Sequence, residues 1–278
     1  MMKKIYAEMT SECVNVFAVK SKRNVASFEL PLEENAAYKG KSVRLIANVR
    51  QTAIRVVDIP YKPAQGKWGL MLQRIKKMEP LSQWDLVKSV FPIGDKMNEN
   101  THIFDGAVFI NKYGEMRYFI TALPMNIADD IAETGIALFG SPHRLKCLVT
   151  IENILFHHYA KQGMDAIWIV FPQNNGFRIL LLANGLPRVA WYVSNEPQFR
   201  EDEILRCLEA SVQSIEKQST EHSLEEGNHE IEIKEIALKQ AIVLNTGWDL
   251  EWLHLLLARQ GIETEQREYC LMDFIEER

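Results

Sequence analysis

Three short polar turns, each following a strand-like apolar run, contain the residues of this chain that could do chemistry. The first turn has Glu8, Thr10 and Ser11; the second has Gln173, Asn174, Asn175 and Gly176; the third has Asn245, Thr246 and Gly247. Carboxylate, hydroxyl and amide groups can hold a polar ligand through hydrogen bonds. The structural alternative is that they only form turns, because Asn-Gly pairs favour hairpins and a hydroxyl or carboxylate at residue 246 or 249 could cap a helix.

Other reactive residues do not form a recognisable catalytic motif. His157 and His158 are neighbours on a predicted helix, where adjacent side chains face different directions, so they cannot easily share one metal ion. His222 and His229 lie in an acidic stretch that is more typical of a solvated loop. The chain contains no P-loop, no G-x-S-x-G and no H-E-x-x-H. We therefore expect no metal site and no catalytic residue from motifs alone.

Composition excludes several classes of protein. The 278 residues are 47% hydrophobic and 25% charged, enough for a two-lobed globular protein. A net charge of -5 makes nucleic acid a poor partner. The chain has no run of 18 apolar residues, and Glu8 and Glu12 stand where a signal peptide would be apolar, so we expect neither a membrane span nor a secretory leader. The four cysteines are about 60 or more residues apart, which fits a reducing cytoplasm.

Hydrophobic patterning predicts that two halves begin alike. Each opens with a meander of three strands, at residues 4–9, 13–20 and 24–30 and again at 166–171, 177–183 and 188–193. The first half continues with a hairpin of strands 42–49 and 52–59, a helix at 69–78, a strand at 84–91 and a hairpin of strands 107–111 and 116–123.

Helices and further strands complete each half. We expect a helix at 127–138 between an Asn126 cap and Gly140, a strand at 145–150 and a helix at 151–162 capped by Thr150. The second half adds a helix at 198–217, a strand at 241–245, a helix at 249–259 and a strand at 269–274. Trp248 and Trp252 face one side of that last helix, either as core or as a partner-facing stripe, with core favoured.

The order and spacing of these elements resemble the PilM-type actin-like proteins of type IV pilus assembly. They also resemble the cytoplasmic part of the related L protein of type II secretion and, more distantly, the division protein FtsA. The residues carrying the resemblance are the two meanders, the hairpin ending at Asp58-Ile-Pro60, and the runs 117–124, 148–152 and 242–253. The resemblance covers nearly the whole chain.

This resemblance implies an α/β, two-lobed actin-like (ribonuclease H-like) fold with an inserted small subdomain in the first half. The first half would span residues 1–147, including an insert at about 42–115, and the second half residues 148–278.

In actin-like ATPases, the first turn of each half binds phosphate and a glycine cluster lets adenosine approach the backbone. The resemblance places these loops at Glu8, Thr10 and Ser11, at residues 173–176, and at residues 245–247. Here the first loop has no glycine, Pro172 replaces the expected aspartate, and the third loop has one glycine followed by Trp248. We therefore predict a pseudo-ATPase, with ATP and Mg²⁺ disfavoured and no catalytic residue.

The resulting hypothesis is a cytoplasmic scaffold of a type IV pilus or type II secretion-like assembly, peripheral at the inner membrane through a partner. As the resemblance implies, the partner would be the cytosolic tail of an inner-membrane assembly protein, with a secretion motor ATPase as a second candidate. The tail would add to a sheet edge around residues 44–55 and 106–119. No nucleic acid is expected.

The alternative is an active actin-like ATPase or a sugar-kinase-like phosphotransferase. Such an enzyme needs a catalytic carboxylate in the cleft, and Glu8 and Glu152 are the only candidates that we can nominate.

Overall fold

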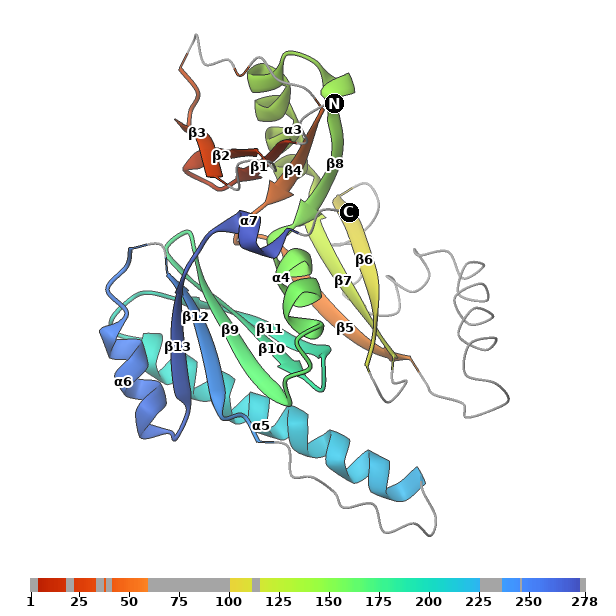
Figure 1. Ribbon diagram of the computed structural model, residues 1–278, viewed down its shortest axis with the longest axis vertical. Helices are drawn as coiled ribbons and strands as arrows, with labels where there is room; N and C mark the ends of the chain where they lie inside the picture. The colour runs from red at the N-terminus through yellow and green to blue at the C-terminus, as the bar shows by residue number, and fades with distance from the viewer. Residues whose placement is uncertain are drawn as a thin grey trace.

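The computed structural model shows two lobes and a third, smaller sheet in the part of the chain that it describes (Figure 1). The structure describes residues 5–18, 23–33, 38, 42–59, 101–111, 116–225, 237–245 and 247–275. The predicted helix 69–78, the predicted strand 84–91 and Thr246 lie outside these residues.

The first lobe is built on a five-stranded sheet in the order β3-β2-β1-β4-β8. The predicted meander is confirmed as the antiparallel strands β1 (Ile5–Met9), β2 (Cys13–Ala18) and β3 (Arg23–Glu29). β4 (Val43–Ala47) runs parallel to β1, and β8 (Leu145–Thr150) runs parallel to β4. Helix α3 (Met125–Phe139) covers one face, where its Leu138 and Phe139 join the core around Ala7 and Met9.

The second lobe repeats the same strand order as β11-β10-β9-β12-β13. Its meander is β9 (Ala166–Gln173), β10 (Gly176–Ala183) and β11 (Leu186–Ser194), followed by the parallel strands β12 (Gln240–Asn245) and β13 (Glu263–Glu268). β9 reads as a continuous apolar run because both of its faces are buried. Ile167, Ile169 and Phe171 face one core cluster, and Trp168 and Val170 face the other.

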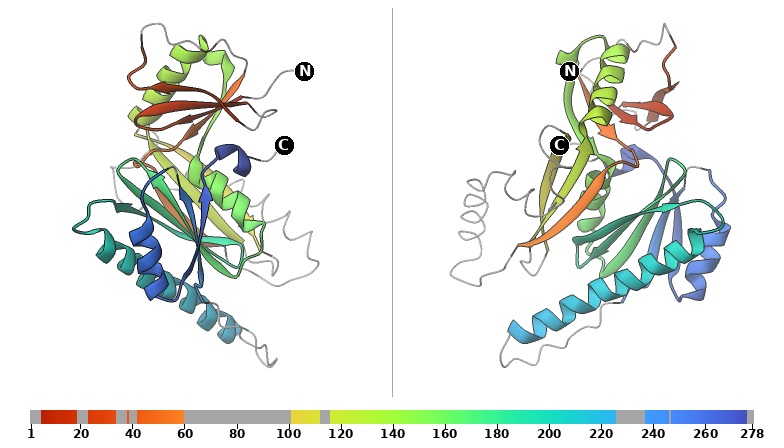
Figure 2. Two further views of the ribbon diagram at one scale, coloured as in Figure 1. Left: turned by 60° about the vertical axis from the view of Figure 1, so that its left-hand side comes forward. Right: turned by 180° about the vertical axis from the view of Figure 1, so that it is seen from behind.

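Helices cover both faces of this second sheet. α5 (Arg200–Glu225) and α6 (Glu251–Arg259) lie on one face, and α4 (Ile151–Ala160) lies on the opposite face, between the sheet and the rest of the molecule (Figures 1 and 2). Leu155, Phe156 and Tyr159 of α4 belong to the core cluster that also contains Tyr6 and Phe17 of the first lobe. One apolar core therefore joins the two lobes.

A three-stranded sheet in the order β5-β7-β6 stands beside the lobes. Its strands are β5 (Ala53–Ile59), β6 (His102–Ile110) and β7 (Met116–Pro124), and the predicted β6–β7 hairpin is confirmed. The predicted hairpin of strands 42–49 and 52–59 is wrong, because β4 and β5 belong to different sheets. β4 has the apolar residues of an interior parallel strand, whereas β5 pairs with β7 along its whole length. The strands of this sheet run from residue 53 to 124, whereas the expected insert was 42–115.

Local predictions at helix ends were partly wrong. Pro124, and not the predicted Asn126, precedes α3. Thr150 stands at the predicted cap position of α4, but its side chain makes no capping hydrogen bond. Gly140 ends α3 in the left-handed conformation at φ 79°, as predicted. A 3₁₀ turn, η2 (Pro142–Arg144), leads into β8.

The predicted strand 269–274 is also wrong. The edge strand is β13, whose sequence ETEQRE has no apolar alternation to reveal it, and residues 271–274 form the short helix α7 (Leu271–Phe274). Leu271, Met272 and Phe274 are buried in the core cluster that joins the lobes. A helical turn places these closely spaced side chains into that core, whereas a strand would turn neighbouring side chains to opposite faces.

Candidate functional site

Six buried or half-buried polar residues meet where the lobes join, and we name them the inter-lobe cluster: Glu8, Asn48, Glu152, Gln173, Arg178 and Tyr269. Asn48 follows β4, and its Nδ2 donates a hydrogen bond to Oε1 of Glu8 at 2.8 Å. Nε2 of Gln173, at the end of β9, donates to Oδ1 of Asn48 at 3.1 Å. The first turns of the two lobes are thus connected through three side chains.

Gln173 continues the cluster into a buried ion pair. Its Nε2 also donates to Oε1 of Glu152 at 3.3 Å, and its Oε1 accepts from Nε of Arg178 at 3.0 Å. The same Nε lies 3.2 Å from Oε1 of Glu152. Nη2 of Arg178 donates to the carbonyl oxygens of Arg50 at 3.0 Å and Thr52 at 3.2 Å. Arg178 therefore holds the segment between β4 and β5 against the second lobe.

Tyr269 brings the third predicted loop into the same cluster. Its hydroxyl donates to Oε1 of Glu8 at 2.5 Å, and its backbone N–H donates to the carbonyl of Asn245 at 2.9 Å. The structure therefore brings together the strand ends of all three sequence-predicted loops.

Burial controls the electrostatics of the cluster. Burial raises the pKa of Glu8, although hydrogen bonds from Tyr269 and Asn48 oppose the shift. Burial also raises the pKa of Glu152, opposed by the charge of Arg178, whose own pKa burial lowers. The pKa of Tyr269 lies well above its usual value because of burial and the charge of Glu8. The cluster therefore favours uncharged carboxyl groups more than water does.

Other residues predicted for the first loop make a turn. Oγ1 of Thr10 accepts from the N–H groups of Glu12 at 3.1 Å and Cys13 at 2.9 Å, and it donates to the carbonyl of Cys13 at 3.1 Å. Ser11 is exposed. The hydroxyl of Thr10 is thus already used within its own turn.

The second loop is a two-residue turn whose glycine has a different role from the one predicted. Asn174 adopts the left-handed conformation at φ 53°, and Asn175 is exposed. Gly176 does not have positive φ; it begins β10 opposite Ser194. A β-carbon there would meet the carbonyl oxygen of Val193 and would lie 2.6 Å from the Tyr192 hydroxyl. Gly176 is therefore required for close packing and not for the turn.

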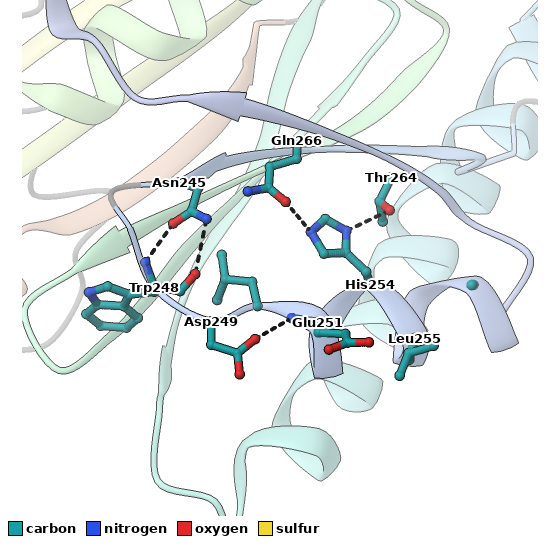
Figure 3. Close-up of a pocket in the computed structure, with 10 residues that line it drawn as sticks. Asn245, Trp248, Asp249, Glu251, His254, Leu255, Thr264 and Gln266 are labelled. Carbon is teal, nitrogen blue, oxygen red and sulfur yellow. Dashed lines mark hydrogen bonds between the residues drawn. The ribbon is translucent and has the colours of Figure 1, made fainter.

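The third loop caps itself. Oδ1 of Asn245 accepts from the N–H groups of Gly247 at 2.8 Å and Trp248 at 2.9 Å, and its Nδ2 donates to the Trp248 carbonyl at 3.1 Å (Figure 3). Gly247 has φ 95°, which favours glycine. The Asn245 side chain therefore stabilises the loop itself.

A pocket of about 550 Å³ opens beside this loop, between α6 and β13. Nδ1 of His254 lies 2.7 Å from Oγ1 of Thr264, and Nε2 lies 3.1 Å from Oε1 of Gln266, so the imidazole joins helix to strand (Figure 3). Asp249, Glu251 and Leu255 line the pocket with them. The pocket thus combines two carboxylates with apolar side chains, since Trp248, Leu250 and Ala258 also line it.

The remaining sequence candidates have structural roles. His157 stacks on Phe109 at 4.5 Å, and His158 lies 5.2 Å edge-on from Phe274. Trp248 and Trp252 both pack against Phe177, which confirms the core interpretation. Among the described residues, no group of histidine, cysteine and carboxylate side chains could hold a metal ion, and the four cysteines are free. His229 lies outside the described residues.

Sequence reasoning missed three members of the cluster. Asn48 ends an apolar strand and Arg178 interrupts the apolar run of β10, so each could have been noticed as a polar residue in a buried context. Tyr269 had no such signal, because it follows the polar strand β13.

The part of the chain that the structure describes contains no helix both long and apolar enough to cross a membrane.

No protein-family model matches the chain, and no curated protein sequence matches it. Solved structures do align with it over nearly the whole length. A Bacteroides thetaiotaomicron protein described as having an actin-like ATPase fold and unknown function covers 98% of this chain and 95% of its own, at 9% identity and TM-score 0.52. A PilM–PilN type IV pilus biogenesis complex covers 98% and 89%, at 12% identity and TM-score 0.54. The two-lobed actin-like fold predicted from the sequence is confirmed.

Proposed function

We propose that this protein is a degenerate actin-like scaffold of a type IV pilus or type II secretion-like inner-membrane assembly, and that it binds partner tails and does not hydrolyse ATP. The observation that carries the proposal is the position of Gln173. Its side chain bonds directly to Asn48 and Glu152, between the turns that would hold phosphate in an actin-like ATPase.

The residues present do not fit a magnesium nucleotide. Oε1 of Glu8 already accepts hydrogen bonds from Asn48 and Tyr269, and burial disfavours its charged form. The Thr10 hydroxyl is engaged in its own turn, and the backbone at Gly176 is crowded by Tyr192. Asp249 and Glu251 line the pocket beside the third loop, where their charges would repel a polyphosphate.

One observation favours the alternative of an active ATPase or phosphotransferase. Two buried carboxyl groups, Glu8 and Glu152, belong to the same cluster, and perturbed carboxyl groups are common in active sites. The direct bonds among their neighbours argue against it, because a phosphate would have to break them.

Calorimetric titration with ATP and Mg²⁺ distinguishes the scaffold proposal from the active enzyme. The scaffold proposal expects no binding tighter than about millimolar, a free energy of roughly -4 kcal/mol. Micromolar binding that Glu8→Gln weakens, while Glu12→Gln on the same turn does not, would overturn it.

The surface proposed for a partner tail is the outer edge of β6. The expected edge at 44–55 is unsuitable over β4, which lies inside the first sheet between β1 and β8. Among the described strands β6 is the last of its sheet, and Ile103 and Ile110 on it are 41% and 40% exposed. An extended tail could add its main chain to this edge and cover both isoleucines.

The partner follows from the fold and from the neighbouring structure, which contains PilM together with PilN. We propose the cytosolic tail of an inner-membrane assembly protein as the partner, and location at the inner membrane through it. A secretion motor ATPase remains a prediction for a second partner.

The tail surface is tested with synthetic cytosolic segments of any single-helix membrane proteins that the neighbouring genes encode. We expect one to bind and Ile103→Asp with Ile110→Asp to reduce its affinity at least tenfold, because charge is placed in an apolar contact. Val25→Asp is the matched control, since Val25 is 43% exposed on the edge strand β3. Equal losses in both variants, or no binding segment, would contradict this surface.

A further inference from the structure

The pocket between α6 and β13 lies against a sheet edge that no described strand covers. β13 is the last strand of its sheet, paired with β12 only. Asn245 and Asp249 line the pocket from the end of β12 and the loop after it, Glu251 and Leu255 from α6, and Thr264 and Gln266 from β13 (Figure 3). We propose that this pocket and edge bind an extended basic segment of a partner protein.

The geometry offers two kinds of contact at one place. An edge strand presents main-chain N–H and C=O groups to an incoming strand, and an adjacent pocket can receive a side chain from it. The hydrogen bonds that join His254 with Thr264 and Gln266 hold α6 against β13, so the pocket wall is fixed before a partner arrives. Less ordering is then needed on binding.

Charge determines which segment fits. β13 and the pocket lining together carry five carboxylates, Glu263, Glu265, Glu268, Asp249 and Glu251, against the single guanidinium of Arg267. Arg267 pairs with Glu265, since its Nε and Nη2 donate to the two oxygens of Glu265 at 2.7 and 2.9 Å. This pair is neutral, so the other four carboxylates supply the net negative charge. The surface is therefore complementary to lysine and arginine.

The same charges disfavour pairing of this edge with β13 of a second copy of this chain. Two β13 strands side by side would bring like carboxylates together, which is how proteins protect edge strands from self-association. The apolar part of the pocket suits a basic side chain, because Leu255 is 53% exposed and can cover the aliphatic stem of a lysine. A basic segment from another protein satisfies both features.

This surface is independent of the proposed tail-binding edge. It belongs to the second lobe, whereas β6 belongs to the third sheet, so either surface can fail without the other.

The test uses the whole chain, labelled with ¹⁵N, and a blocked hexapeptide of alternating lysine and valine. We expect amide shifts concentrated at residues 247–251 and 263–268. Asp249→Asn with Glu251→Gln should weaken the affinity about fivefold, as expected for two partly exposed ion pairs. The double variant Glu263→Gln with Glu268→Gln tests the contribution of β13, and it should weaken the affinity for the peptide by a similar factor.

Asp129→Asn with Asp130→Asn on α3 is the matched control, because both residues are exposed and the change in net charge is the same. The control should keep the affinity of the unmodified protein, and a hexapeptide with glutamate in place of lysine should not bind. Equal weakening by the control, shifts spread over other surfaces, or binding of the glutamate peptide would each overturn the proposal.

Discussion

Nε2 of Gln173 donates a hydrogen bond to Oδ1 of Asn48 across 125 residues of sequence, and this bond joins the two lobes at their first turns. The bond is buried, and both residues also bind carboxyl groups, Glu152 on one side and Glu8 on the other. The two turns that the sequence resemblance aligns with phosphate loops are here connected through protein atoms.

Removing this connection should destabilise the protein. Gln173→Ala leaves Asn48, Glu152 and Arg178 each without one buried partner, and we expect a loss of about 2 kcal/mol or more in the free energy of unfolding. Denaturant unfolding measures it. Asn175→Ala on the same turn is the control, because its side chain is exposed, and an equal loss there would show that only the turn matters.

The ion pair of Glu152 and Arg178 should be strongly coupled. Arg178→Met leaves the buried carboxyl without its cation and frees the carbonyls of Arg50 and Thr52, so we expect a loss of about 3 kcal/mol or more. The double variant with Glu152→Gln should lose less than the sum of the two single variants. Additive losses in a double-mutant cycle would contradict direct pairing.

The contribution of Glu8 to the free energy of unfolding should decrease as pH rises. Because its pKa is raised in the folded protein, the folded state binds more protons than the unfolded state between pH 4.5, the ordinary pKa, and the raised value. The stabilising contribution is therefore complete below pH 4.5 and is lost as pH rises through the folded pKa. Glu8→Gln keeps an oxygen for Asn48 and Tyr269 but cannot ionise, so it should gain stability relative to the unmodified protein over this range.

Urea unfolding at several pH values from 4.5 upward checks this. Glu12→Gln, an exposed change on the neighbouring turn, provides the comparison. A constant difference between Glu8→Gln and the unmodified protein across this pH range would mean that the pKa of Glu8 is not raised.

Hydrophobic patterning predicted the strands whose signal is local. β9 was correctly placed because its apolar run, from Ala166 to Phe171, has the length of a strand and is followed by turn-forming residues, Pro172 to Gly176. β13 was missed because it is a polar edge strand, and β4 was assigned to the wrong partner because pairing depends on residues far away in the chain. Sequence patterns reveal burial, but the register and neighbours of a strand are set by tertiary packing.

The polar site was predicted only in part for the same reason. Glu8, Gln173 and Asn245 were chosen from their turns, yet Tyr269, which meets Glu8, is 261 residues away. Arg178 binds the carbonyl of Arg50 over 128 residues. No local pattern connects such residues, so their contacts could be found only from the folded structure.

Gly176 should tolerate no side chain, because the start of β10 is packed against β11. A β-carbon there would collide with the Val193 carbonyl, which is main chain and cannot move aside, and with the Tyr192 ring. We expect Gly176→Ala to reduce the free energy of unfolding by about 2 kcal/mol, typical of overpacking. Differential scanning calorimetry would report this loss as a lower Tm.

Gly135→Ala within α3 is the matched control for that substitution. Its β-carbon would come no closer than 3.2 Å to the flexible tip of Leu145, and alanine favours a helix by about 1 kcal/mol over glycine. The control should therefore lose little or no stability. If Gly176→Ala were as stable as the control, the close packing of β10 against β11 at this point would be wrong, and Gly176 would again be interpreted as a turn residue.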